Sequence, residues 1–207
     1  MVKQELKNIF LSASIPLKER DEKYFDSADI IAIRDSVIAL ATVVLPNHRL
    51  IWGGHPSITP IIYYVMERLG LKVQDHVLLY QSKFFKKFFP GDNNKFENII
   101  LTENIQNDKD KSLLHMRERM LSEWKFAAAV FIGGMEGIEG DRNKGIEGEY
   151  EMFIERHPNA IVLPISSTGA ASRIVFDNYL SPEFRNQRLV NDYAYMSLFQ
   201  DLLIDKI

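Results

Sequence analysis

The sequence alternates between short, continuous apolar segments and longer segments with helical spacing, and this alternation limits the folds open to the chain. Runs that are apolar throughout are typical of strands buried on both faces of a parallel sheet. Turn residues bound each such run. The predicted strands are Ile9–Ala13, Leu50–Trp52, Val77–Tyr80, Ile99–Leu101, Ala127–Ile132 and Ile161–Ile165.

The longer segments predict helices that connect and cover these strands. Asp29 and its neighbours can cap the start of the first predicted helix, and Gly70 can end the second in the left-handed conformation. Strands that alternate with helices imply right-handed crossovers. The predicted fold class is α/β: a single-domain, Rossmann-like, doubly wound and mostly parallel sheet with helices on both faces. The predicted helices are Ala28–Leu45, Ile58–Leu69, Asp110–Lys125, Gly148–Arg156 and Leu189–Ile204.

The 207 residues suit one domain, 1–207, and contain no internal repeat or long linker. Two segments keep two interpretations each. The C-terminal helix, about 189–204, packs either on the domain or on a second subunit. The phenylalanine-rich segment Phe84–Phe96 is either a loop whose aromatic rings are tucked under the domain or an exposed partner surface.

Composition excludes several functional classes. Lys and Arg total 25 against 28 Asp and Glu, for a net charge of −3 and a pI near 6.0, which argues against a nucleic-acid partner. The chain has no cysteine, no apolar stretch long enough for a membrane span and no signal-like start. Its five histidines show no metal-ligand spacing. We therefore expect a cytoplasmic protein with no membrane association, no metal and no cofactor.

Small residues follow four of the predicted strands. In a parallel α/β sheet, ligands bind at the carboxyl ends of strands, where small residues let backbone N–H groups approach a phosphate. One such turn is explained as well by a tight strand-to-helix connection, but four at one edge favour a nucleotide or sugar-phosphate pocket. Neither a Walker A nor a GxGxxG pattern is present, which disfavours nucleoside-triphosphate hydrolysis and ordinary dinucleotide binding. The candidate ligand-binding residues are Ser12, Ser14, Gly53, Gly54, His55, Gly133, Gly134, Gly145, Thr168, Gly169 and Arg173.

Three of these candidates have open alternatives. His55 either contacts the ligand or caps its own turn. We also expect only one of Ser12 and Ser14 to face the crevice.

Arg117 lies on the apolar stripe of its predicted helix, four residues after Leu113 and three before Met120. A buried arginine requires an anionic partner, either a protein carboxylate or a bound phosphate. The alternative is that Arg117 extends to the helix edge and pairs with Glu118 or Glu123.

Four motifs together resemble the SLOG superfamily, which comprises Smf/DprA-like and LOG-like Rossmannoid domains. The segments are FLSASIP, IWGGHPSITPII, HMRERM and FIGGMEG…GIEGEYEMF. The resemblance covers nearly the whole chain. It implies that Arg117 and Glu149 occupy the positions of the catalytic arginine and glutamate of LOG-type phosphoribohydrolases, with Glu147 the competitor for the glutamate position.

The motifs depart from the LOG pattern at several positions. Ile132 replaces a proline, Glu118 replaces a lysine, and Gly145-Ile146 stands where Gly-Thr is expected. The inserted stretch Glu136–Lys144 separates the Gly-Gly pair from the Glu-bearing helix. The start of the chain and this split motif look most like the nucleotide-sensing SLOG branch associated with prokaryotic conflict systems.

These observations support two functions. The first is a sensor of a nucleotide or an NAD-derived nucleotide in a defence or stress system, signalling through an effector partner or a change of oligomer. The second is an enzyme that cleaves the N-glycosidic bond of a nucleoside 5′-monophosphate, with Arg117 and Glu149 as its catalytic residues. A third interpretation is an interaction protein whose pocket has decayed. The resemblance also implies a homodimer or higher homo-oligomer, whereas the identity of the ligand stays open.

Overall fold

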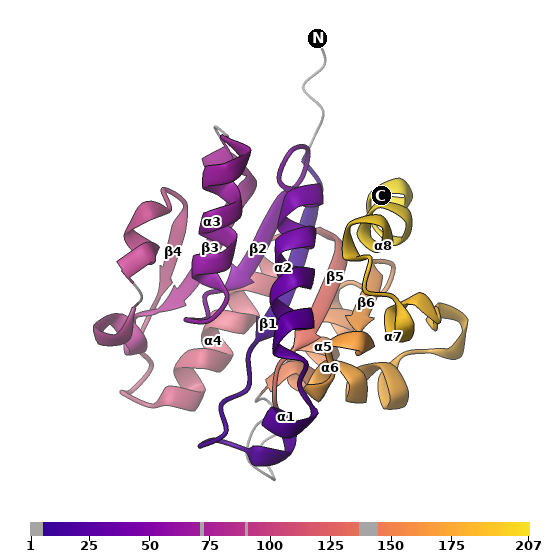
Figure 1. Ribbon diagram of the computed structural model, residues 1–207. Helices are drawn as coiled ribbons and strands as arrows, with labels where there is room; N and C mark the ends of the chain where they lie inside the picture. The colour runs from indigo at the N-terminus through magenta and orange to yellow at the C-terminus, as the bar shows by residue number, and fades with distance from the viewer. Residues whose placement is uncertain (1–5, 71–72, 90, 137–144) are drawn as a thin grey trace.

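The computed structural model describes residues 6–70, 73–89, 91–136 and 145–207. Six parallel strands form one sheet in the order β4-β3-β2-β1-β5-β6 (Figure 1). Every predicted strand is present, and the fold is the predicted single-domain Rossmann-like α/β architecture. The strands are β1 (Asn8–Ser14), β2 (Arg49–Gly53), β3 (Val77–Ser82), β4 (Ile99–Thr102), β5 (Phe126–Gly133) and β6 (Ile161–Ile165).

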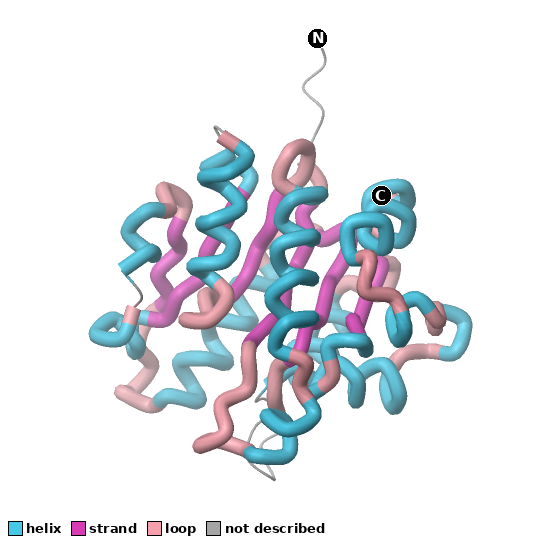
Figure 2. Tube along the Cα trace, in the orientation of Figure 1, coloured by secondary structure: helices cyan, strands magenta, loops and turns pink. Residues whose placement is uncertain are grey.

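Both faces of the central strands are buried. Successive side chains of a strand point to opposite faces of the sheet, so each strand contributes to two hydrophobic cores. Ile9 and Leu11 of β1 belong to one hydrophobic core, and Phe10 belongs to the other. Helices α2 (Ile30–Val44), α3 (Thr59–Leu69) and α8 (Tyr195–Leu202) cover the first face. Helices α4 (Lys109–Ser122), α5 (Gly145–Arg156) and α6 (Ala170–Ile174) cover the second (Figure 2).

The first predicted helix, Ala28–Leu45, is α2 in the structure, and a short helix that was not predicted precedes it. Helix α1 (Glu22–Ser27) begins after Asp21, whose carboxylate accepts a hydrogen bond from Lys23 N. Helix α2 then begins after Asp29, which accepts from Ala32 N. Gly70 ends α3 at φ +63°, as predicted.

The predicted continuous C-terminal helix is wrong. Helix α7 (Arg188–Asn191) stops at Asp192, which is extended and accepts a hydrogen bond from Ala194 N, and α8 starts afresh at Tyr195. Leu198 and Phe199 of α8 are fully buried in the core that includes α2. Of the two predicted packing partners, the structure therefore shows the helix on its own domain.

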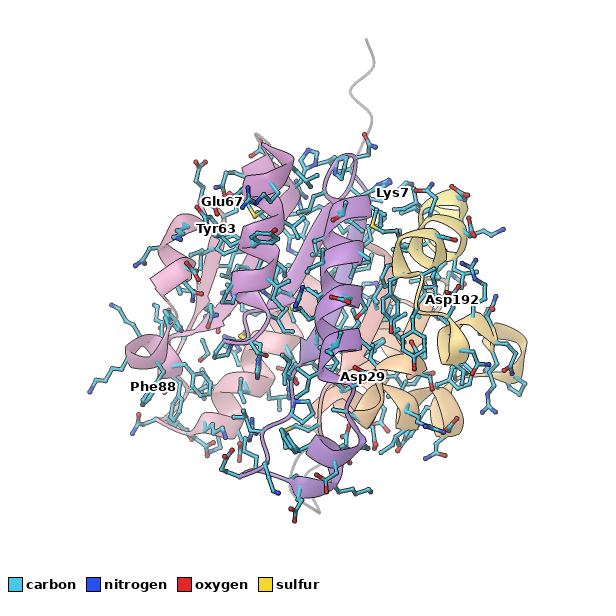
Figure 3. The ribbon with its side chains drawn as sticks, viewed as in Figure 1. Lys7, Asp29, Tyr63, Glu67, Phe88 and Asp192 are labelled. Atoms are coloured by element: carbon cyan, nitrogen blue, oxygen red, sulfur yellow. The ribbon has the colours of Figure 1, made fainter. Side chains whose placement is uncertain are left out.

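The phenylalanine-rich segment Phe84–Phe96 has some aromatic rings buried in the domain and others exposed, so each predicted alternative describes part of it. It forms the 3₁₀ helices η2 (Lys83–Phe88) and η3 (Gly91–Lys95). Phe96 is buried against Trp52, with ring centroids 5.4 Å apart. Phe88, in contrast, is 76% exposed at the edge of the molecule (Figure 3).

Two further features concern the helices. The sequence did not predict α6 or the π-helical turn Val175–Tyr179 that follows it. Within the described parts of the chain, no helix has the length and apolar character needed to cross a bilayer.

Candidate functional site

A cavity of about 670 Å³ opens at the carboxyl ends of β1, β2 and β3 and is closed on one side by α4 and the start of α5. It lies beside the point where the strand order reverses between β1 and β5. This is the position at which open parallel sheets bind ligands. Eight of the thirteen predicted site residues line it: Ser12, Ser14, Gly53, Gly54, His55, Arg117, Gly145 and Glu149.

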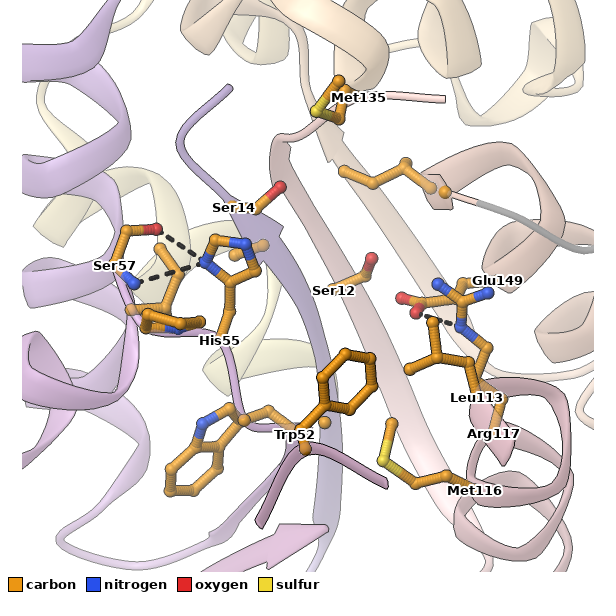
Figure 4. Close-up of a pocket in the computed structure, with 18 of the residues that line it drawn as sticks. Ser12, Ser14, Trp52, His55, Ser57, Leu113, Met116, Arg117, Met135 and Glu149 are labelled. Carbon is orange, nitrogen blue, oxygen red and sulfur yellow. Dashed lines mark hydrogen bonds and ion pairs between the residues drawn. The ribbon is translucent and has the colours of Figure 1, made fainter. Parts of the chain in front are cut away.

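Arg117 and Glu149 form an ion pair on the cavity wall (Figure 4). The Nε of Arg117 donates to Oε1 of Glu149 over 2.7 Å, and Arg117 is only 9% exposed. Met116 and Met120 anchor the same face of α4 in the core, which holds the guanidinium beside the start of α5. The buried arginine therefore has the predicted carboxylate partner, and that partner is neither Glu118 nor Glu123.

Glu149, and not Glu147, is the carboxylate of α5 that faces the cavity. The Glu147 carboxylate accepts a hydrogen bond from Tyr179 Oη over 2.8 Å, and Glu147 is not among the lining residues. The backbone N–H of Glu147 donates to Oε1 of Glu136 over 2.9 Å.

Glu136 also lines the cavity, although it was not among the predicted site residues. Burial raises the pKa of its carboxyl to about 7, with smaller contributions from the negative charges of Glu147 and Glu149. The Glu147 N–H and the positive charge of Arg117 oppose this shift. No sequence signal marks Glu136, because its burial depends on how the chain returns to α5. The rest of the stretch Glu136–Lys144, that is 137–144, lies outside the described residues.

His55 occupies the opposite side of the cavity from the ion pair (Figure 4). Its Nδ1 lies 2.8 Å from the Ser57 hydroxyl and accepts a hydrogen bond from Ser57 N. Ser57 Oγ itself accepts from Ile15 N, so its own proton is available to Nδ1. This arrangement leaves the ring proton on Nε2. Burial, aided by Arg20, lowers the pKa of His55 to about 4, so the ring is a neutral N–H donor near pH 7.

Both Ser12 and Ser14 line the cavity, so the expectation that only one faces it is wrong. Residues two apart on a strand point to the same side of the sheet. Figure 4 shows the two serines between His55 and the Arg117–Glu149 pair.

At four of the predicted glycine positions, the backbone N–H group is hydrogen-bonded within the protein. Gly54 N donates to Tyr80 O, Gly134 N to Ser14 O, and Gly169 N to Ser166 O. Gly133 N donates to the buried hydroxyl of Thr168 over 2.9 Å. Side chains therefore supply the polar groups that we can assign to this cavity.

The other five predicted residues lie outside the cavity lining, and their role in binding stays a prediction. Thr168 is fully buried, and its hydroxyl links the end of β5 to Ile165 O and Ser172. The remaining glycines pack tightly: a Cβ on Gly134 would lie 1.9 Å from Ile146, and one on Gly169 would lie 2.0 Å from Ser27 O. The Arg173 side chain is 65% exposed and lies 3.8 Å from Asp177. The predicted residues that do not line the cavity are Gly133, Gly134, Thr168, Gly169 and Arg173.

The described residues contain no group of three or more histidine, aspartate or glutamate side chains placed to hold a metal ion.

A model of the SLOG cluster3 family matches residues 23–203, a range that contains Arg117, Glu149 and every helix that lines the cavity. A search of curated proteins finds no match.

Proposed function

Because the chain belongs to the SLOG cluster3 family, we propose that its cavity binds a nucleotide or a nucleotide derivative. The observation that carries this proposal is the buried Arg117–Glu149 pair on the wall of a cavity of about 670 Å³. Cavities of a few hundred to about a thousand cubic ångströms hold ligands of nucleotide size. The guanidinium is shaped for a phosphate and the carboxylate for ribose hydroxyls.

The protein acts in this proposal as a sensor, with an NAD-derived nucleotide among the ligands it would take. Binding alone requires no group that stabilises developing charge, so it tolerates Gly145-Ile146 in place of Gly-Thr. The neutral His55 N–H and the hydroxyls of Ser12 and Ser14 supply donors for phosphate or ribose oxygens. A prokaryotic defence or stress system is the context we propose. The signal would pass to an effector partner or through a change in a homo-oligomer.

A second candidate function rests on Glu136 and Glu149, two carboxylates that line one cavity. In this function the C1′–N bond of a nucleoside 5′-monophosphate breaks and the oxygen of a water molecule bonds to C1′. The products are ribose 5-phosphate and the free base, which takes up a proton. Glu149 would stabilise the positive charge that develops on the sugar, and Glu136, with its pKa of about 7, would donate the proton to the base. The proton that the water molecule loses as it bonds to C1′ would restore the protonated form of Glu136.

Isothermal titration of the common nucleoside 5′-monophosphates and NAD tests the proposed binding. We expect Arg117→Met combined with Glu149→Gln to weaken binding at least tenfold, since a charge-assisted hydrogen bond to a ligand contributes roughly 1.5–3 kcal/mol. The double substitution removes both charges of the ion pair together, so that neither member is left without the other. Arg34→Ala, at an exposed arginine of α2 that does not line the cavity, is the matched control and should bind as the wild type does. Equal affinities for the double variant and the wild type would refute a ligand site at this ion pair.

A further inference from the structure

Three phenylalanines form one side of the cavity, and neither proposed function uses them. Phe85, Phe88 and Phe89 come from the η2 helix and the residue that follows it. Phe88 is 76% exposed, and Phe85 and Phe89 are only partly buried. Exposed aromatic rings gathered at one cavity leave apolar area in water that a ligand can cover.

Local hydrogen bonds and an ion pair fix η2 directly after β3, at the ligand-binding edge of the sheet. Ser82 Oγ caps the helix by accepting from Phe84 N over 3.3 Å. Lys83 Nζ lies 2.5 Å from Glu103, beyond the end of β4. The rings of Phe84 and Phe85 pack edge to face with their centroids 5.0 Å apart. The first residues of η2 are therefore held by a capping hydrogen bond, an ion pair and a ring contact.

The cavity offers both apolar and polar side chains. Leu113 and Met116 of α4 add apolar surface to the cavity (Figure 4). His55 and the Arg117–Glu149 pair lie on opposite sides of it, with the serines of β1 between them. A ligand that fills the cavity thus needs a flat apolar part as well as a polar part that spans several donors.

We propose that Phe85, together with Phe88 and Phe89, is the platform on which the base of the bound nucleotide stacks. This inference rests on the proposed function and specifies its ligand class: nucleotides that carry an aromatic base, in preference to sugar phosphates without one. Base–aromatic stacking tolerates different bases, because every base has a π-face. The sugar and phosphate lie along the serines, His55 and the ion pair.

The test compares AMP and UMP with ribose 5-phosphate by isothermal titration. The wild type is expected to bind at least one of the two nucleotides roughly tenfold more tightly than ribose 5-phosphate, a ratio within the usual range for stacking on one aromatic ring. A triple leucine variant, Phe85→Leu with Phe88→Leu and Phe89→Leu, keeps apolar side chains at these positions but removes the rings. This variant should lose the preference for nucleotides while its affinity for ribose 5-phosphate changes by less than about twofold. Phe85→Tyr should retain the preference.

Phe184→Leu is the matched control, because Phe184 is 64% exposed and does not line the cavity. This variant should behave as the wild type does. Equal affinities of the wild type for the nucleotides and ribose 5-phosphate would overturn the base platform and leave the proposed function standing. A preference that persists in the triple leucine variant would place the base elsewhere. If the wild type binds neither the two nucleotides nor ribose 5-phosphate, the platform fails as a site for nucleoside monophosphates, and the titration of NAD described above decides whether the proposed function fails too.

Discussion

Arg117 shows how much a single residue reveals about a site before the structure is known. Its place on an apolar stripe required an anionic partner, and the structure supplies Glu149 at 2.7 Å. Spacing did not choose between that carboxylate and those of its own helix, because the choice depends on how α4 packs against α5. Glu136 and the neutral state of His55 were not predictable, since burial sets the pKa of each group and burial is a tertiary property.

The raised pKa of Glu136 makes stability depend on pH in a defined direction. Its folded-state pKa of about 7 lies above the ordinary value of 4.5, so between these values the folded protein binds a proton that the unfolded chain releases. The contribution of this group to the free energy of unfolding therefore decreases as pH rises from about 4.5 to about 7. Urea denaturation at about pH 5 and about pH 8 should show a smaller decrease for Glu136→Gln than for the wild type.

Glu118→Gln, which changes an exposed glutamate on α4, controls for the loss of one negative charge. It should follow the wild-type pH dependence. An identical pH dependence for Glu136→Gln and the wild type would show that Glu136 titrates near its ordinary pKa.

At the scale of elements, the strands and their small-residue turns were predictable, but the use of those turns was not. Gly54, Gly133, Gly134 and Gly169 follow strands as expected. The N–H groups of Gly54, Gly133 and Gly134 bond to residues distant in the sequence, so these bonds form only after the sheet is assembled, whereas the N–H of Gly169 bonds locally to Ser166 O. The break before α8 was missed for a different, local reason. The Asp192 carboxylate accepts a hydrogen bond from Ala194 N, and this local bond competes with continuation of the helix.

The turn after β6 should act on stability and not on ligand affinity. Gly169 has φ +69°, and a Cβ there would lie 2.0 Å from Ser27 O, a backbone atom. Gly169→Ala should therefore lower the free energy of unfolding by roughly 1–3 kcal/mol. Thr168→Val, which leaves the buried N–H of Gly133 without its acceptor, should cost roughly 1–3 kcal/mol.

Chemical denaturation measures both effects. Gly91→Ala is the control, since a Cβ there meets nothing within 4 Å and the residue has no positive φ. Nucleotide affinity should stay unchanged in Thr168→Val. A selective loss of affinity with unchanged stability would instead assign Thr168 to the ligand site.

At the scale of the whole molecule, the sequence predicted the six parallel strands, and the structure adds their order. That order decides which residues meet. It brings the ends of β1, β2 and β3 together beside α4 and α5, and leaves the turn after β6 outside the cavity lining. Family membership over residues 23–203 agrees with this arrangement. The aromatic side of the cavity was not predicted, because the direction of the η2 rings depends on the helix turn and not on hydrophobic pattern.

The most direct measurement of the central claim is ultrafiltration of the purified protein with a pool of nucleoside monophosphates, cyclic nucleotides, NAD and ADP-ribose derivatives. Mass spectrometry then identifies the compounds in the retained and filtered fractions. We predict that the wild type retains an intact nucleotide that the Arg117→Met, Glu149→Gln variant does not retain. Free base and ribose 5-phosphate in the wild-type filtrate alone would establish the second candidate function at the same site. A pool that is neither retained nor cleaved would contradict nucleotide binding in this cavity.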